Sequence, residues 1–346
     1  MKLLVTGGCG FIGSNFIRYV LKVHPDWEIV NLDKLTYAGN LKNLKDVEGN
    51  PRYRFVKGDI ADRNLVHALF AEEKFTAVVN FAAESHVDRS ILDPAPFIET
   101  NVKGTQVLLE AARAHGVEKF LQISTDEVYG SLDPDDPPFS EESPLRPNSP
   151  YAASKASADL LCRAYYKAYG VPVAITRSSN NYGPYQFPEK LIPLMIRNAL
   201  QGMPLPVYGR GENIRDWLYV EDNCKAIDLV LQRGRAGEIY NIGGGCEKKN
   251  LEVVQMICNI LEELNPPALH RPLHSLITFI RDPRGAAHDL RYALDCRKIK
   301  EELGWEPKVS FEEGLRRTVE WYLDNGDWVE SVITGEYLEY YQKVYG

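Results

Sequence analysis

The sequence lacks the features that would place it in a membrane, on nucleic acid or in an oxidising compartment. No apolar run approaches the roughly 20 residues that a membrane-spanning helix needs. With a formal net charge of −8, the chain has no basic excess that would favour nucleic acid or an anionic membrane. Its six cysteines form no Cys-x-x-Cys pair and keep no metal-type spacing to histidine. We therefore expect reduced thiols, no metal site and a cytoplasmic protein.

What the sequence does contain is a regular alternation of short apolar strands and helical stretches over its first half. Strands are predicted at 2–6, 28–31, 53–56, 77–80, 120–123 and 173–176, and helices at 11–23, 63–73, 102–115 and 151–169. This alternation predicts an α/β fold with a Rossmann-type doubly wound parallel sheet. The segment 133–150 holds six prolines, so we expect a surface loop there.

The regular pattern ends near residue 178. Prolines and glycines break up residues 179–216, and the segment 262–289 reads as rich in loops. Irregular segments of this kind commonly carry the substrate-binding residues of an enzyme. We predict a nucleotide-binding domain formed by residues 1–178 and about 217–243. The remainder, about 179–216 and 244–346, is expected to form a smaller, mixed α/β substrate-binding lobe towards the C-terminal side.

A glycine-rich loop follows the first predicted strand and opens the first predicted helix. Within residues 7–13, glycines stand at Gly7, Gly8, Gly10 and Gly13. Glycines let backbone N–H groups approach a pyrophosphate, and the helix start adds a favourable dipole. Asp33 ends the second strand, where a carboxylate binds a ribose diol and repels a 2′-phosphate. The pattern predicts NAD rather than NADP, with Asp59 and Ile60 beside the adenine unless Asp59 only caps the next helix.

A tyrosine and a lysine share one face of the predicted helix 151–169. Tyr151 and Lys155 are four residues apart, and a lysine ammonium near a phenol favours the phenolate. Such a tyrosine can take the proton of a sugar hydroxyl while hydride leaves the same carbon. Thr125 follows the strand 120–123, at the strand end where sheets of this type bind ligands. We expect its hydroxyl to bridge Tyr151 and the reacting oxygen.

Two acidic residues come directly after Thr125 and exceed what hydride transfer requires. Asp126 and Glu127 could be solvated loop residues, but they lie at the predicted reaction centre. Two close carboxylates tend to separate their pKa values, leaving one protonated and the other ionised. That arrangement suits an elimination, in which one group removes a proton from carbon and the other protonates a departing hydroxyl.

Several stretches of the chain resemble the extended short-chain dehydrogenase/reductase family and, within it, the dTDP-glucose 4,6-dehydratases. The matching stretches are GGCGFIGSN (7–15), LDKLTYAGN (32–40), AAESHVDRS (82–90), STDEVYG (124–130), YAASK (151–155), NNYGPYQFPEKLIP (180–193) and RDWLYVEDN (215–223). The resemblance runs from the N-terminus to about residue 310. The preference for thymidine over uridine rests on this resemblance alone.

The resemblance implies a lyase mechanism in three steps. Tyr151 takes the proton of the glucose 4-hydroxyl while the C4 hydride passes to NAD. Glu127 then removes the C5 proton while Asp126 protonates the C6 hydroxyl, which leaves as water. The hydride returns to C6, so the product is dTDP-4-dehydro-6-deoxyglucose and NAD stays tightly bound.

Further roles are implied position by position. Besides the glycine loop, Tyr151 and Lys155, the cofactor-facing residues implied are Phe11, Ile12, Asp33, Lys34, Thr36, Asp59, Ile60, Ala82, Ala83, Thr100 and Asn181. Besides Thr125, the substrate-facing residues implied are Ser85, Asn180, Lys190, Leu191, Pro206, Tyr208, Arg215 and Asn250. Arg215 is the main candidate for the diphosphate, because a guanidinium fork fits paired phosphate oxygens. The alternative for Arg215 is a surface ion pair with Asp216.

One segment departs from the family pattern. Residues 282–289 read DPRGAAHD, which is two residues longer than the usual DRPGHD and has arginine and proline exchanged. Arg284 is a candidate for the diphosphate from this segment. His86 and Asp88 are expected to shape the site rather than react, and no role is assigned to His270 or His274.

Other functions stay open on the same fold. A UDP-sugar 4-epimerase needs Tyr151, Lys155 and NAD but has no use for the acidic pair. A sugar-nucleotide decarboxylase needs a pocket for a C6 carboxylate, for which only Arg89 is at hand near residues 82–90. A non-catalytic NAD- and sugar-sensing protein would not need the Tyr/Lys pair. The family resemblance further implies a homodimer formed through helices at 102–115 and 154–169.

Overall fold

A parallel sheet forms the centre of the computed structural model, which describes residues 1–264, 266, 272–333 and 335–345. Among these residues, seven strands pair in parallel, in the order β10 (Ile239–Ile242), β6 (Val173–Ser178), β5 (Lys119–Thr125), β4 (Ala77–Asn80), β1 (Lys2–Thr6), β2 (Glu28–Asp33) and β3 (Tyr53–Lys57). The strand order reverses between β1 and β4, where sheets of this type bind ligands at their carboxyl edge.

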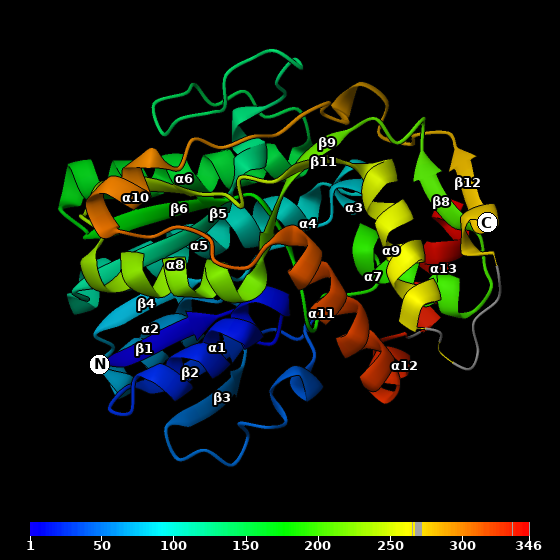
Figure 1. The fold of residues 1–346 in the computed structure, drawn as a ribbon. Helices are drawn as coiled ribbons and strands as arrows, with labels where there is room; N and C mark the ends of the chain where they lie inside the picture. The colour runs from blue at the N-terminus through cyan, green and yellow to red at the C-terminus, as the bar shows by residue number, and fades with distance from the viewer. Residues whose placement is uncertain (265, 267–271, 334, 346) are drawn as a thin grey trace.

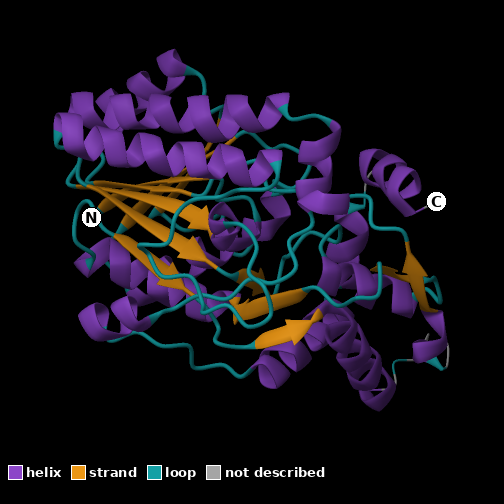
Figure 2. Cartoon of the chain, turned by 90° about the horizontal axis from the view of Figure 1, so that it is seen from above, coloured by secondary structure: helices purple, strands orange, loops and turns teal. Residues whose placement is uncertain are grey.

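Helices cover both faces of this sheet (Figure 2). Side chains alternate along β1, so Leu3 and Val5 pack on one face and Leu4 on the other. The first face is covered by α1 (Phe11–Val23), α8 (Val220–Arg233) and α10 (Arg297–Leu303), and the second by α2 (Arg63–Glu73), α5 (Thr105–His115) and α6 (Pro150–Tyr169). The predicted doubly wound Rossmann-type fold is confirmed.

A second lobe lies beside the carboxyl edge of the sheet, on the right of Figure 1. Its sheets join β11 (Glu247–Lys249), β9 (Ile214–Tyr219) and β7 (Asn180–Tyr182), and β12 (Ile277–Ile280) with β8 (Leu205–Tyr208). Since β11 runs antiparallel to β9 while β7 runs parallel, this lobe is mixed, as expected. Its helices are α7 (Leu191–Leu200), α9 (Asn250–Leu264), α11 (Phe311–Asp324), α12 (Gly326–Val332) and α13 (Gly335–Tyr345). The predicted domain boundaries stay predictions.

Short helices connect the longer elements. They are η1 (Leu41–Leu44), α3 (Val87–Leu92), α4 (Ala95–Phe97), η2 (Ile98–Gly104), η3 (Asp126–Tyr129), η4 (Leu273–Leu276) and η5 (Gly285–Ala287). The helix predicted at 102–115 begins later than expected, because residues 98–104 form a wider π-helical turn. Gly104 in this turn packs so closely on Ile60 that a Cβ there would lie 2.5 Å from the Ile60 side chain. The π-turn brings Thr100 to the cavity described below.

The helix α7 was not predicted, because Pro193 interrupts its sequence pattern. Pro193 is the third residue of α7, where a backbone N–H has no partner within the helix, so the proline costs no hydrogen bond there. By contrast, the predicted start of α6 is confirmed. The Ser149 side chain accepts a hydrogen bond from the Ala152 N–H at 3.1 Å, and Pro150 occupies the first turn.

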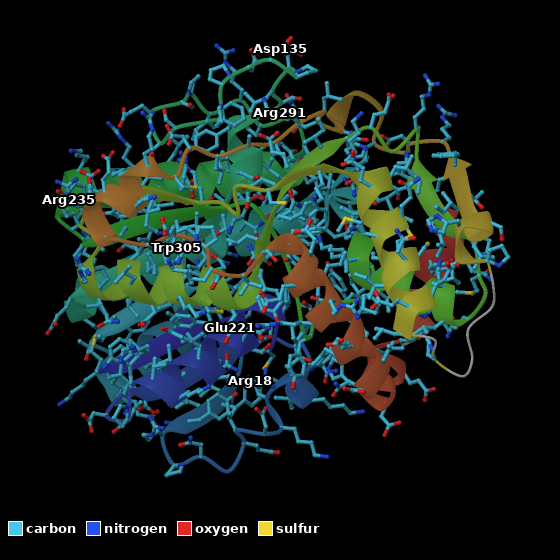
Figure 3. The ribbon with its side chains drawn as sticks, viewed as in Figure 1. Arg18, Asp135, Glu221, Arg235, Arg291 and Trp305 are labelled. Atoms are coloured by element: carbon cyan, nitrogen blue, oxygen red, sulfur yellow. The ribbon has the colours of Figure 1, made fainter. Side chains whose placement is uncertain are left out.

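The predicted loop 133–150 is largely exposed up to residue 148 and crosses the surface, although Pro150 already begins α6. Figure 3 shows Asp135 at the outer edge of this loop with Arg291 beneath it. The Arg291 guanidinium donates to the Asp136 carbonyl at 2.7 Å and pairs with Glu247 at 2.5 Å. This arginine therefore fastens the loop to the second lobe. All six cysteines are free thiols. In the part of the chain that the structure describes, no helix is long and apolar enough to cross a membrane.

Candidate active site

A cavity of about 310 Å³ opens at the carboxyl edge of the central sheet. Every residue that the sequence predicts to face the cofactor lines it: Gly7, Gly10, Phe11, Ile12, Gly13, Asp33, Lys34, Thr36, Asp59, Ile60, Ala82, Ala83, Thr100, Tyr151, Lys155 and Asn181. We call this space the first cavity. It also contains Ser85, Thr125, Asp126 and Glu127, so the predicted nucleotide site and the predicted reacting groups are continuous.

The glycine loop fits a dinucleotide pyrophosphate because its glycines leave no room for side chains. Gly7 has a φ of +66°, and a Cβ on it would lie 2.6 Å from the backbone nitrogen of Ala82. A Cβ on Gly13 would lie 2.5 Å from the Gly7 carbonyl oxygen. The loop leads into α1, whose N-terminal N–H groups and dipole favour an anion.

Asp33 is held in place at the end of β2. Its two carboxylate oxygens accept the backbone N–H groups of Cys9 and Leu35, each at 2.8 Å. Burial raises the pKa of Asp33, and these two hydrogen bonds oppose the rise. Asp59 pairs with Lys34 at 2.7 Å and does not cap α2, because Asp62 accepts the N–H groups at the start of that helix.

The predicted Tyr/Lys pair lies on the buried side of α6. The Lys155 ammonium donates to the carbonyl of Ile123 on β5 at 2.7 Å, which ties the helix to the adjacent strand. Tyr151 is 8% exposed and packs edge-on against Phe97. Thr125 ends β5, and its hydroxyl accepts the Glu127 N–H at 3.3 Å and donates to Asp126 at 3.2 Å.

We call residues 125–129 the acidic turn, because they place both carboxyl groups at the cavity. Burial, then the neighbouring charge of Glu127, raises the pKa of Asp126 well above its usual value. Burial also raises the pKa of Glu127, but the cations Lys190, Arg284 and Arg215 oppose this rise. The alternative that both acids are solvated is wrong, since Asp126 is 2% exposed and both line the cavity. Asp126 is accordingly the easier of the two to protonate.

Burial also acts on the Tyr/Lys pair. It raises the pKa of the Tyr151 phenol, as does the charge of Glu127, whereas a hydrogen bond with Thr125 lowers it. Burial lowers the pKa of Lys155, which the charge of Asp159 opposes. A base at Tyr151 therefore needs nearby positive charge to reach the phenolate form.

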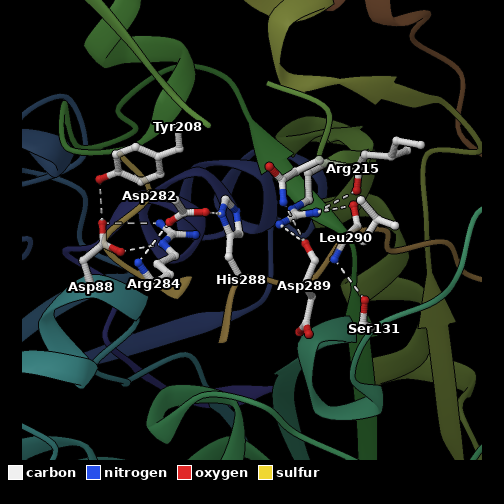
Figure 4. A network of polar contacts seen from close by, with 11 residues as sticks. Asp88, Ser131, Tyr208, Arg215, Asp282, Arg284, His288, Asp289 and Leu290 are labelled. Carbon is white, nitrogen blue, oxygen red and sulfur yellow. Dashed lines mark hydrogen bonds and ion pairs between the residues drawn. The ribbon is translucent and has the colours of Figure 1, made fainter. Parts of the chain in front are cut away.

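A second cavity of about 160 Å³ adjoins the first and shares Glu127, Asn180, Asn181, Gln186, Glu189 and Lys190 with it. The remaining residues predicted to face the substrate line this second cavity: Leu191, Pro206, Tyr208, Arg215, Asn250 and Arg284. Figure 4 shows how the polar groups at its wall are arranged. The residues predicted to face the cofactor and those predicted to face the substrate thus come together around the acidic turn.

Arg215 and Arg284 reach the second cavity from different elements (Figure 4). Arg215 on β9 donates to the carbonyls of Ile214 and Asp289, at 2.8 and 3.0 Å, and lies over the Tyr292 ring. The alternative of a surface ion pair with Asp216 is wrong, because Arg215 is 6% exposed. The Asp216 carboxylate instead accepts the N–H groups of Gly244 and Cys246.

Arg284 pairs with Asp88 at 2.5 Å, and Tyr208 donates to the same carboxylate at 3.2 Å. The two-residue-longer segment 282–289 therefore still brings its arginine to the cavity. His86 is buried at the start of α3 and also lines this cavity. His274 contacts Asn259 at 2.9 Å on the surface, and His270 lies outside the described residues.

Comparisons with known proteins place the chain in a family. A family model described as GDP-mannose 4,6 dehydratase matches residues 4–318. The dTDP-glucose 4,6-dehydratase of Haemophilus influenzae is 54% identical over 336 residues, which cover 94% of this chain and 98% of that protein.

The chain belongs to the dTDP-glucose 4,6-dehydratase family.

Two solved structures of this family agree with that assignment. The dTDP-glucose 4,6-dehydratase of Streptomyces venezuelae, crystallised with NAD and dTDP, superposes with a TM-score of 0.90 and 51% identity, covering 96% of this chain and all of that one. The enzyme of Bacillus anthracis, in complex with NAD, gives a TM-score of 0.87 and 50% identity, with the same coverage. The resemblance seen in the sequence is confirmed.

The structure of this dehydratase-family chain adds cavity residues that sequence reasoning missed. Glu189 lies between the two cavities and pairs with Arg89 at 3.2 Å, and Tyr292 and His288 line the second cavity. Glu189 belongs to the stretch 180–193 that carried the resemblance, so its position beside Lys190 was the available signal. His288 had no local signal, since its contact with Asp282 depends on the turn of the 282–289 segment.

Proposed function

We propose that this protein converts dTDP-glucose to dTDP-4-dehydro-6-deoxyglucose and water, as an NAD-dependent hydro-lyase. The observation that carries the proposal is the buried acidic turn between the two cavities. A carboxyl group such as that of Asp126 is costly to bury, and it lines the first cavity together with Glu127, which both cavities share. Membership of the family and the NAD and dTDP bound by its solved members support the same reaction.

The residues of the chain would supply proton transfer and orientation. Bound NAD would supply a reversible hydride acceptor, held by the glycine loop and Asp33. Tyr151 takes the proton of the sugar 4-hydroxyl, and the Lys155 charge together with the cationic nicotinamide favours its phenolate form. Thr125 holds the phenol and the reacting oxygen in line through its hydroxyl, which lies at the end of β5.

The two carboxyl groups divide the elimination between them. Glu127 acts as the base for the C5 proton, because Lys190 and the two arginines favour its ionised form. Asp126 acts as the acid for the C6 hydroxyl, because burial and the Glu127 charge favour its protonated form. Both pKa values are raised, but that of Asp126 is raised further, and such a separation is the pattern expected for an acid and a base that work in one step.

The second cavity would hold the nucleoside diphosphate. Arg215 offers a buried guanidinium for the phosphate oxygens, with Arg284 and Lys190 adding positive charge on either side. Ser85, Asn180 and Asn250 provide polar contacts, while Leu191, Pro206 and Tyr208 provide the apolar wall.

Rival reactions on this fold fit the site less well. A 4-epimerase would leave the two carboxyl groups of the acidic turn without a catalytic role. A decarboxylase needs a cation for the C6 carboxylate, but Arg89 lines neither of the two cavities and lies over the Tyr37 ring at 3.8 Å. A non-catalytic sensor would not need Tyr151 and Lys155 aimed at the same cavity as the acidic turn.

A labelled substrate tests the reaction directly. Incubation of the purified protein with dTDP-glucose deuterated at C4 should give a product that carries the label at C6 of the same molecule. Label retained at C4 with inverted configuration would identify an epimerase and overturn the proposal. The same incubation with UDP-glucose, followed by NMR, measures the preference for thymidine.

We further propose a cytoplasmic homodimer formed through α5 and α6. Leu160 in the middle of α6 is 57% exposed, and an apolar side chain at this place suits contact with a second copy. Leu160→Glu should convert the dimer to a monomer in light scattering, whereas Leu338→Glu on α13 should not. A monomeric wild-type protein would contradict this proposal.

A further inference from the structure

A buried ion pair lies behind the predicted catalytic residues and has no role in the reaction described so far. Asp159 on α6 and Arg177 on β6 are 2% and 3% exposed, and their Nε–Oδ2 distance is 2.9 Å. Burying two charges is costly, and an apolar pair of similar size is often equally stable. A buried pair at this place therefore calls for a reason beyond stability.

The position of Asp159 connects it with the Tyr/Lys pair. Tyr151, Lys155 and Asp159 are spaced four residues apart along α6, so they lie in one row on the helix. Lys155 is 4% exposed, and the charged or titratable groups that act on its ammonium are Asp159 and Cys162 of the same helix. One Asp159 oxygen accepts from Arg177, while the other is buried without a hydrogen-bond partner among the described residues.

Arg177 connects the same pair with the acidic turn. Its guanidinium lies over the ring of Tyr129, the last residue of η3, at 4.8 Å from the ring centre. Tyr129 is 1% exposed, and its hydroxyl donates to Asn241 on β10 at 2.8 Å. Arg177 also lies next to Ser124 in the register of β5 and β6. The ion pair thus joins α6, which carries Tyr151 and Lys155, to the acidic turn, which carries the other predicted reacting groups.

We propose that the Asp159–Arg177 ion pair is a positioning pair for the proposed reaction, which keeps the Lys155 ammonium charged beside Tyr151 and holds the acidic turn against the same helix. A buried ammonium tends to lose its proton unless a negative charge lies near it. Asp159 supplies that charge, and Arg177 fixes the carboxylate in place through their 2.9 Å contact. The inference rests on the proposed function, but its central claim concerns the charge of Lys155.

A double substitution separates this role from a purely structural one. Asp159→Asn alone leaves Arg177 buried without its counter-charge, so we expect it to destabilise the fold. Asp159→Asn combined with Arg177→Gln removes both charges and should recover most of the melting temperature. If the pair is only structural, this double variant should behave like the wild type. The exposed pair Arg235→Gln with Glu302→Gln serves as the matched control.

The readout is the titration of Lys155 itself. NMR of protein labelled at the lysine side chains, with the Lys155 signal assigned by its loss in Lys155→Arg, gives the pH midpoint of the ammonium. We expect the midpoint in the folded double variant to fall by about one pH unit or more, since the Lys155 ammonium loses the carboxylate one helical turn away on α6. An unchanged midpoint in the folded double variant would overturn the inference. Because this titration needs no turnover, its outcome is independent of the labelled-substrate test of the function.

Kinetics provide the second readout. In the pH profile of kcat, the decrease at high pH is expected where Lys155 loses its proton. This decrease, the alkaline limb, should move to lower pH in the double variant by the same amount as the NMR midpoint. The control pair should leave the limb in place. A limb that stays at the wild-type pH in the double variant would equally contradict the role assigned to Asp159.

Discussion

The acidic turn and the 282–289 segment serve adjoining cavities but are positioned in different ways. The acidic turn continues a buried strand of the central sheet, and Thr125 binds its near neighbours Asp126 and Glu127. In the 282–289 segment, Arg284 is held by Asp88, which lies 196 residues away in the chain. The two proposed reacting carboxyl groups are thus held by near neighbours in the sequence, whereas Arg284, a proposed diphosphate ligand, is held by a long-range pair. We expect substitutions to act on turnover in the first region and on substrate affinity in the second.

The largest effect is expected at Tyr151. Tyr151→Phe removes the base for the sugar hydroxyl and should lower kcat by at least about 10³-fold, with KM little changed. Single-turnover measurement of nicotinamide reduction should show the first oxidation lost. Tyr169→Phe, an exposed tyrosine on the same helix, is the control. A large rise in KM with kcat retained would place Tyr151 among the binding groups and break the comparison.

Glu127→Gln should separate the two steps within the acidic turn. We expect the first oxidation to survive while elimination slows by about 10²-fold or more, because the amide cannot take the C5 proton. In the wild type, activity should fall as the pH drops through the raised pKa of Glu127, so the acid limb should lie above about pH 4.3, the value of a free glutamate.

The same substitution should abolish that acid limb in the residual activity, which a pH series on the variant would reveal. Glu142→Gln on the exposed loop should change neither step. Equal loss of oxidation and elimination in a folded Glu127→Gln protein would contradict the division of roles.

In the second cavity, Arg215→Met should raise KM about 10- to 100-fold, because it removes a charge-assisted hydrogen bond to the diphosphate, whose free energy corresponds to a change of that size. The effect on kcat should be smaller than that on KM and should come from the loss of a positive charge that favours ionised Glu127. Titration with dTDP alone measures the loss of affinity directly, with Arg210→Met as an exposed control. Unchanged dTDP affinity would show that the diphosphate binds elsewhere.

The same contrast explains what could be predicted from the sequence. Strand ends and helix caps are local, so Asp33, Thr125 and the Ser149 cap were found from periodicity and turn chemistry. The glycine loop and the Tyr/Lys spacing likewise carry their chemistry within a few residues. In contrast, α7 was missed because Pro193 resembles a helix breaker, although it sits in the tolerant first turn.

Tertiary pairings account for the remaining misses. Nothing near Glu189 in the sequence indicates its contact with Arg89, which is 100 residues away. Likewise, nothing near Asp159 indicates its contact with Arg177 on β6, 18 residues later. The π-turn at 98–104 depends on the close packing of Gly104 on Ile60, which periodicity does not report. Charged residues that are buried together are therefore the part of this site that only three-dimensional structure reveals.

The smallest expected effect concerns the stability that the Asp88–Arg284 pair gives to the second region. Burial raises the pKa of the Asp88 carboxyl, but the charge of Arg284 and its hydrogen bond lower it more. The pKa of Asp88 therefore falls from 3.8 to about 2. A carboxyl with a lowered pKa stabilises the fold fully above the unfolded-state pKa of about 4, and this contribution disappears as the pH falls towards 2. We expect Asp88→Asn to lower the free energy of unfolding by on the order of 2 kcal/mol at pH 6, as a shift of this size implies.

Urea unfolding at a series of pH values tests the sign of this effect. The difference between wild type and Asp88→Asn should be constant down to about pH 5 and should shrink below about pH 4. Asp135→Asn on the exposed loop should show no such difference at any pH. If the Asp88→Asn difference persists unchanged to pH 3, the carboxylate charge is not what holds the segment. The 282–289 segment would then be positioned by its own backbone, as the acidic turn is, and the contrast between the two regions would fail.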